Sequence, residues 1–340
     1  MSPAALVEAG SNMSRYLTRV RPLRLIVPHL TPRKLPRLAV QPVEAPVVAP
    51  ANPLVAQERS FNSTPKSLGL GATAPQVARG LPEFSLQGKV IVVSGGARGL
   101  GLTQAEALLE AGAIVHAIDR LPTPDPDFEK VALRATAELG TSLSYHQVDV
   151  RDVAQLNDIV EGIANQHGRM DGLIAAAGIQ QETPALEYKA EDVDRMMGVN
   201  VTGSFMTAQA VARQMVRLGT GGSIVLIASM SGTVANRGLI CPAYNASKAA
   251  VLQLGRNLAA EWGAHGIRVN TISPGYIVTA MVEALFVEYP ERKVEWPKHN
   301  MLNRLSQPSE YRGAAVFLLS DASSFMTGSD LRIDGGHCAW

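Results

Sequence analysis

Cysteines and long apolar runs are both scarce in this 340-residue chain. The only two cysteines, Cys241 and Cys338, lack the spacing of a metal-binding motif, so the sequence predicts neither a disulfide framework nor a metal site. No apolar run reaches the roughly 18 residues that a membrane-spanning helix needs, which argues against a membrane partner. With 46% hydrophobic and 18% charged residues, the composition is typical of a soluble folded protein.

Acidic residues are missing from the stretch between Ala9 and Val43. Residues 1–68 carry nine basic and three acidic side chains, a net charge of +6, whereas the remaining residues have a net charge of −5. Arginines recur among apolar residues in this first part, which is typical of a mitochondrial transit peptide. We therefore predict that residues 1–68 are a transit segment and linker, disordered or removed, and that the protein enters the mitochondrial matrix. A disordered solubilising tail on a cytoplasmic protein is the alternative.

Residues 69–340 are long enough for one domain with a single core, and their mildly acidic charge disfavours nucleic acid as a partner. The β-branched run 89–93 predicts a buried strand, and a glycine-rich turn and the helix-forming residues 103–110 follow it. A strand, a glycine turn and a helix N-terminus together can hold a pyrophosphate, although a plain strand-to-helix turn has the same pattern. The residues predicted to form this phosphate cradle are Ser94, Gly95, Arg98, Gly99, Leu100 and Gly101.

A second apolar run, residues 113–118, ends at Asp119. At this distance beyond Gly101, a carboxylate can accept hydrogen bonds from an adenosine ribose, although a solvated strand-end carboxylate is the structural alternative. The charge of Asp119 would repel a 2′-phosphate and favours NAD as the cofactor. Arg98 and Arg120 would attract such a phosphate, which leaves NADP as the other candidate.

Strand-like and helix-like stretches continue to alternate after Asp119. Residues 144–148 favour a third strand, 152–167 a helix, 172–178 a fourth strand and 222–229 a fifth. This alternation predicts an α/β fold, a single Rossmann-type doubly wound parallel sheet with helices on both faces. Ligands bind such sheets at the carboxyl ends of the strands, so residues there are the first functional candidates.

Three side chains suited to proton transfer lie at and after the fifth strand. Ser229 ends the strand, and Tyr244 and Lys248 are four residues apart in a predicted helix, which places them on one face. A phenol has an ordinary pKa near ~10, and an ammonium ~4 Å away would lower that pKa by up to roughly three units. Tyr244 could then act as acid or base on an alcohol and ketone pair, although a Tyr and a Lys also occur by chance at this spacing.

Taken in order, these elements resemble the short-chain dehydrogenase/reductase family over about residues 85–340. The resemblance rests on the glycine turn, Asp149, Ala175–Gly178, Asn200, Ser229, Tyr244, Lys248, Pro274–Gly275 and Asp334–Gly336. It implies that Tyr244 exchanges a proton with the substrate oxygen and that Ser229 holds that oxygen. Lys248 would bind the nicotinamide ribose, and Asn200 would position a water in the proton path.

The family pattern also implies further cofactor contacts. Asp149 and Val150 would border the adenine, and Ile277 and Thr279 would clamp the carboxamide. The remaining predicted contacts are Arg120, Ala176, Gly178, Tyr244, Lys248, Pro274 and Gly275. The chain departs from the pattern at Ser94, where threonine is usual, and at Ala175–Ala176, where two asparagines are usual. The second departure removes an amide bridge between strands but no proton-transfer group.

An amphipathic segment at about 280–304 follows the clamp and is predicted to be a substrate lid, with a plain surface helix as the alternative. The ending through Trp340 resembles tails that pack between subunits, so a homotetramer or homodimer is expected. Within the family, the sequence is most similar to the polyol and ketose branch, which implies a small secondary alcohol or ketone such as arabinitol as substrate. A 3-oxoacyl or hydroxyacyl reductase is the second hypothesis, and a non-catalytic nucleotide-binding protein is the third.

Overall fold

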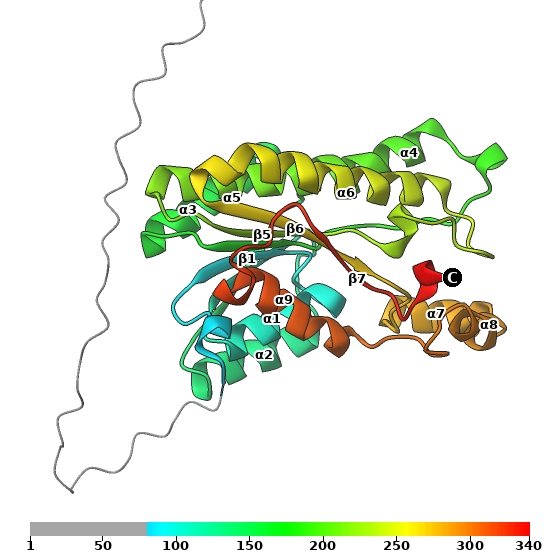
Figure 1. Cartoon of the computed structure of the whole chain (residues 1–340), viewed down its shortest axis with the longest axis horizontal. Helices are drawn as coiled ribbons and strands as arrows, with labels where there is room; N and C mark the ends of the chain where they lie inside the picture. The colour runs from blue at the N-terminus through cyan, green and yellow to red at the C-terminus, as the bar shows by residue number, and fades with distance from the viewer. Residues whose placement is uncertain (1–79) are drawn as a thin grey trace, which may run out of the picture. The chain divides into compact units, whose positions relative to one another are not determined.

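The computed structural model describes residues 80–340, apart from the side chains of residues 280, 281 and 284. The predicted transit segment, residues 1–68, therefore lies outside the described residues. Figure 1 shows the described part as a twisted sheet between two layers of helices.

One seven-stranded sheet runs through the described residues, and each neighbouring pair of strands is parallel. The strand order is β3-β2-β1-β4-β5-β6-β7, so the direction in which strands are added reverses between β1 and β4. The bounds are β1 Val90–Ser94, β2 Ile114–Asp119, β3 Leu143–Gln147, β4 Gly172–Ala175, β5 Gly222–Ile227, β6 Ile267–Pro274 and β7 Asp330–Ile333. All of β1 is buried, as expected for a β-branched run covered on both faces. The predicted fold class is confirmed.

Helices cover both faces of this sheet (Figure 1). The apolar sides of α3, α5 and α6 pack on one face, and those of α1, α2 and α9 pack on the other. The helix bounds are α1 Gly99–Glu110, α2 Pro126–Ala137, α3 Val153–His167, α4 Ala190–Met197, α5 Ser204–Leu218, α6 Pro242–Trp262, α7 Ala280–Glu288, α8 Arg292–Lys298 and α9 Arg312–Leu319. A smaller apolar cluster joins α7 and α8 to Tyr276, just after β6.

Local sequence explains where α3 begins and ends. The Asp152 carboxylate accepts a hydrogen bond from the Gln155 N–H at 3.1 Å, which caps the helix N-terminus. Gly168 ends the helix with a φ of +65°, a conformation that favours glycine. The helix predicted over 152–167 is therefore found, with Asp152 as its cap.

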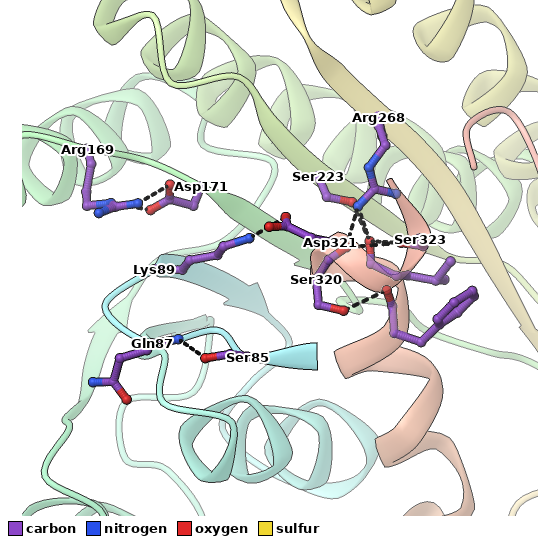
Figure 2. Close-up of polar contacts among 12 residues, drawn as sticks. Ser85, Gln87, Lys89, Arg169, Asp171, Ser223, Arg268, Ser320, Asp321 and Ser323 are labelled. Carbon is purple, nitrogen blue, oxygen red and sulfur yellow. Dashed lines mark hydrogen bonds and ion pairs between the residues drawn. The ribbon is translucent and has the colours of Figure 1, made fainter. Parts of the chain in front are cut away.

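Polar contacts tie together the amino-terminal edge of the sheet (Figure 2). Arg268, near the start of β6, donates to the carbonyl of Leu318 at 2.8 Å and to that of Met326 at 3.0 Å. Ser223 of β5 donates to the same Leu318 carbonyl at 2.6 Å. These bonds satisfy backbone groups where α9 ends, a place at which helix carbonyls lack partners within the helix. This edge of the sheet is therefore occupied by structural contacts.

Three histidines meet where the end of α3 contacts β2 and β3. The Nδ1 atom of His116 lies 3.0 Å from Nε2 of His146, and its Nε2 atom lies 2.9 Å from Nε2 of His167. Burial, together with the neighbouring His146 and His167, lowers the pKa of His116 to about 4. The folded protein therefore keeps this imidazole neutral at pH values where a free histidine is already protonated.

This cluster predicts a specific loss of stability in mild acid. Between its unfolded value of 6.5 and about 4, the unfolded chain binds a proton at His116 that the folded protein does not bind. The contribution of neutral His116 to stability is therefore complete above pH 6.5 and falls as the pH drops towards 4. We expect the urea midpoint of the wild type to fall between pH ~7.5 and pH ~5 by more than that of His116→Gln, measured by circular dichroism. The control His265→Gln changes an exposed histidine and should follow the wild type; identical pH dependence in His116→Gln would contradict the prediction.

Candidate active site

The turn between β1 and α1 brings two backbone segments into close contact. Gly95 has a φ of +67°, and a Cβ atom on it would lie 2.8 Å from the nitrogen of Ala177. A Cβ atom on Gly101 would collide with the carbonyl oxygen of Gly95. Because only glycine fits these positions, the free N–H groups at the start of α1 can approach a ligand closely. Ser94, the last residue of β1, links the turn to the segment after β4, since its hydroxyl accepts a hydrogen bond from the Ala177 N–H at 3.3 Å.

A cleft of about 840 Å³ lies beside this turn, at the carboxyl ends of β1 to β4. Its volume is in the usual range for a small-molecule or cofactor site. The predicted cofactor-binding residues in its wall are Gly95, Arg98, Gly99, Leu100, Gly101, Asp119, Arg120, Asp149, Val150, Ala176, Gly178 and Thr279. The wall residues not predicted from sequence are Leu121, Asp125, Val148, Arg151, Ala177, Ile179, Gln180, Arg195 and Val199. Most of these follow closely after a strand end, which is the signal that could have identified them.

Charges of both signs meet in one part of the cleft wall. The Asp119 carboxylate accepts two backbone N–H bonds of 3.3 Å each, which fix its position. Asp149 is bound by Arg151 at 2.6 Å, and this hydrogen bond lowers the pKa of Asp149. Arg98 and Arg120 are exposed and belong to the same wall. Asp119, which would repel the 2′-phosphate of NADP, and the arginines that would attract it therefore line the same cleft.

Ser229, Tyr244 and Lys248 come together where β5 ends. The Ser229 hydroxyl accepts a hydrogen bond from the Ser231 N–H at 3.2 Å and is also hydrogen-bonded to the Tyr244 phenol. Lys248 follows Tyr244 by one turn of α6, with its Nζ atom 5.6 Å from the centre of the Tyr244 ring. A Cβ atom on Gly178, in the cleft wall, would lie 3.7 Å from that Nζ atom, so the ammonium borders the cleft.

The electrostatics of this group differ from the sequence expectation. Burial raises the pKa of Tyr244 to about 12, and the hydrogen bond with Ser229 offsets only part of this rise. Burial also lowers the pKa of Lys248 to about 8. The Lys248 ammonium donates to the Ile227 carbonyl at 2.8 Å, and the pKa of Tyr244 is governed by burial, Ser229 and Cys241. Desolvation therefore outweighs attraction by the lysine, and Tyr244 is a neutral phenol at neutral pH.

Asn200 lies in a widened, π-helical segment, Gly198–Gly203, between α4 and α5. Such segments are frequent at functional sites. The fully buried Asn200 amide accepts from the Ile179 N–H at 2.8 Å and donates to the Ile179 carbonyl at 2.9 Å. It also donates to the Ser247 hydroxyl at 2.9 Å. Asn200 thus joins the segment after β4 to the residue before Lys248, while its predicted role in positioning a water stays a prediction.

The predicted carboxamide clamp lies between the sheet and the C-terminal part of the chain. The Gly275 N–H donates to the Ile333 carbonyl of β7 at 2.9 Å. Pro274 ends β6, and Ile277 pairs with Ser306 through an isolated parallel bridge. The Thr279 hydroxyl accepts from the Val282 N–H at 3.4 Å and caps α7. The clamp segment therefore leads directly into the predicted lid, which consists of α7, α8 and the following turn.

Two structural expectations concern metals and membranes. Within residues 80–340, no group of three or more His, Cys, Asp or Glu side chains is arranged to hold a metal ion. In the same part of the chain, no helix is both long and apolar enough to cross a bilayer.

The chain is similar to many known proteins. Residues 95–337 match a family model described as enoyl-(acyl carrier protein) reductase. A short-chain dehydrogenase/reductase from Aspergillus versicolor is 43% identical, over 76% of this chain and 89% of that protein. A ribulose-forming D-arabinitol 2-dehydrogenase from Candida tropicalis is 36% identical, over 76% of this chain and 96% of that protein. A galactitol 2-dehydrogenase from Rhizobium johnstonii is 41% identical, over 76% of this chain and 98% of that protein.

Solved structures agree with these sequence relatives. A gluconate 5-dehydrogenase from Burkholderia cenocepacia, in complex with NADP and tartrate, matches with a TM-score of 0.68 and 34% identity over 76% of this chain and 98% of that one. A carveol dehydrogenase from Mycobacterium avium, in complex with NAD, matches with a TM-score of 0.69 and 30% identity over 75% of this chain and 99% of that one.

Proposed function

This chain belongs to the short-chain dehydrogenase/reductase family and is an NAD(P)-dependent alcohol dehydrogenase, and from this premise we propose that it interconverts a sugar alcohol and a ketose with Tyr244 as acid and base. The observation that carries the proposal is the grouping of Ser229, Tyr244 and Lys248 at the border of the cofactor cleft. The non-catalytic hypothesis is set aside, because the relatives named above are dehydrogenases.

The cleft fits a nicotinamide dinucleotide. The glycine turn leaves the space that a Cβ atom would fill at Gly95 and Gly101, where a pyrophosphate needs close backbone approach. Bound there, the cofactor supplies the hydride acceptor or donor. We assign the preference to NAD, because Asp119 places a fixed carboxylate where a 2′-phosphate would meet repulsion.

The residues of the chain then have separate tasks in proton transfer. In ketone reduction, the neutral Tyr244 phenol donates its proton to the substrate oxygen, which the Ser229 hydroxyl holds in place. In alcohol oxidation the proton moves the other way, and the positive charge of Lys248 favours the phenolate that must form first. Asn200 is hydrogen-bonded both to Ile179 and to Ser247, the residue before Lys248, and so fixes the position of these two segments relative to each other.

A sugar alcohol is the substrate class that the relatives support, since two of them are named for arabinitol and galactitol. The structure offers a further polar group near the lid: the hydroxyl of Tyr276, a residue only 7% exposed, has no hydrogen-bond partner among the described residues. A panel of pentitols and hexitols, assayed by NADH absorbance, tests the proposal. Oxidation of none of them would refute the substrate class.

A 3-oxoacyl or hydroxyacyl reductase is the alternative, because the description of the matching family model names a reductase of acyl thioesters. The same assay run with 3-hydroxyacyl and 3-oxoacyl thioesters separates the two. A kcat/KM for a thioester well above that of every polyol would favour the alternative.

Localisation and assembly extend the proposal. We place the protein in the mitochondrial matrix on the basis of residues 1–68, and N-terminal sequencing of protein from its native cells should then find a start near residue 69 rather than residue 1. We also propose a homotetramer that uses the C-terminal tail, because Trp340 is 81% exposed and lies near the exposed Met301 and Leu302 stretch through a bond to His299. Light scattering on the purified protein measures the assembly directly.

A further inference from the structure

One ion pair links two segments that are far apart in the chain. Arg292, the first residue of α8, donates through both terminal nitrogens to the Glu182 carboxylate, at 2.9 and 2.8 Å. The two side chains are only 15% and 26% exposed. A forked pair of this kind is both stronger and more directional than an ordinary surface ion pair.

The Glu182 side of the pair is connected to the segment that precedes Tyr244. Glu182 is two residues beyond Gln180, which lines the cofactor cleft. The N–H of the next residue, Thr183, donates to the Ile240 carbonyl at 3.0 Å, close before Tyr244 in the chain. Burial raises the pKa of Cys241 to about 11, and the charge of Glu182 adds to this rise, so the carboxylate acts on the segment that carries Tyr244.

The Arg292 side of the pair belongs to the lid. The guanidinium lies 4.2 Å from the ring centre of Tyr289 and 5.4 Å from that of Trp296. Trp296 stacks on Tyr276 with the ring centres 4.4 Å apart, and Tyr276 directly precedes the predicted clamp residue Ile277. Arg292 is therefore held against the lid residues Tyr289 and Trp296 by packing as well as by its charge.

Glu182 is the carboxylate that is hydrogen-bonded to Arg292 among the described residues, and Glu291 adds a weaker attraction without a hydrogen bond. Glu291 is exposed and is not bonded to Arg292 through its side chain in the described structure. Arg195, which also lines the cleft, is bonded to Gln181 and to Asp192. Glu182 is thus the group that neutralises Arg292.

We propose that Glu182 sets the charge of the substrate that the enzyme accepts. By binding both nitrogens of Arg292, Glu182 occupies the guanidinium fork that a carboxylate-bearing sugar acid would otherwise use. The pair of Glu182 and Arg292 is then neutral as a whole and leaves neutral polyols unaffected, while a sugar acid brings an unpaired negative charge beside Glu182. This inference rests on the proposed polyol function and deepens it.

The test compares a neutral and an acidic substrate in the wild type and in Glu182→Gln. With D-arabinitol and D-gluconate, the variant should raise the ratio of kcat/KM for gluconate to that for arabinitol by at least ~10-fold, because Arg292 becomes free for the carboxylate. Glu182→Gln/Arg292→Gln removes both charges and should return the ratio to the wild-type value. Glu187→Gln, which alters an exposed glutamate in the same segment, should leave the ratio unchanged.

Calorimetry separates this inference from the proposed function. Gluconate should bind the NADH complex of Glu182→Gln at least ~10-fold more tightly than the NADH complex of the wild type, whether or not any polyol is oxidised. An enzyme that is inactive on all polyols would refute the proposed function, but the measured gluconate affinity would still test the role of Glu182. If Glu182→Gln does not fold, Glu182→Met serves in its place, since it removes the charge at similar volume. An unchanged gluconate affinity, or a gain that persists after Arg292 is also replaced, overturns the inference.

Discussion

Replacing Tyr244 by phenylalanine is expected to lower kcat by at least ~100-fold, the scale of acid–base catalysis by a positioned group. The substitution removes only the hydroxyl that is hydrogen-bonded to Ser229, while the ring keeps its place beside Lys248. NADH affinity should therefore change by no more than about twofold. Steady-state kinetics on the best polyol and fluorescence titration with NADH measure the two quantities.

A second buried tyrosine provides the control for this experiment. The Tyr311 hydroxyl is bonded to Ser306 at 2.7 Å and to the Ile333 carbonyl at 3.1 Å, and the residue is fully buried. Tyr311→Phe should lower the melting temperature, because it removes both hydrogen bonds of this buried hydroxyl, and should leave kcat within a few-fold of the wild type. If Tyr244→Phe turned over within ~10-fold of the wild type, Tyr244 would not be the acid and base.

Replacing Asp119 by serine is expected to shift cofactor preference towards NADP by at least ~100-fold in the ratio of the two kcat/KM values. At an effective dielectric of ~20, a carboxylate ~4 Å from a phosphate charge costs up to ~4 kcal/mol, and removing it leaves Arg98 and Arg120 to attract the phosphate. Serine retains a small polar side chain at the end of β2. Kinetics with NAD and NADP at one fixed substrate concentration give the ratio.

Asp125 offers a matched control, since it lines the same cleft. Its carboxylate accepts from the Asp127 N–H at 3.0 Å and caps α2. Because serine caps a helix about as well as aspartate, Asp125→Ser should keep the cap of α2 and leave the cofactor ratio within about twofold. A variant Asp119→Ser that still preferred NAD as strongly as the wild type would show that the cofactor is selected elsewhere.

Short-range signals account for most of the fold. The β-branched run of β1, the glycine turn after it and the cap at Asp152 each act within a few residues, so they can be read from the sequence. The fourth strand is shorter than predicted, since β4 ends at Ala175. Ala176 and Gly178 leave the sheet to line the cleft, and the sequence alone does not separate small residues in a strand from small residues beside a ligand.

The sequence predicted that Tyr244 and Lys248 share a helical face, but it did not predict their electrostatics. The spacing of Tyr244 and Lys248 places them on one helical face, as found. The direction of the Tyr244 pKa depends on burial by several distant segments, and a local argument about one lysine missed it. Glu182 and Arg292 are 110 residues apart in the chain, so no local sequence pattern could have predicted their ion pair.

Arg268 and Ser223 both donate hydrogen bonds to the Leu318 carbonyl, and these bonds have a consequence for the evolution and engineering of the protein. They fasten β5, β6 and α9 at the edge of the sheet opposite the cleft, so the stability of the scaffold draws on bonds that no substrate touches. We therefore expect substitutions in the lid to cost the fold less stability than substitutions of Arg268 or Ser223. Selection can therefore change the substrate specificity through the lid while the sheet keeps its structure.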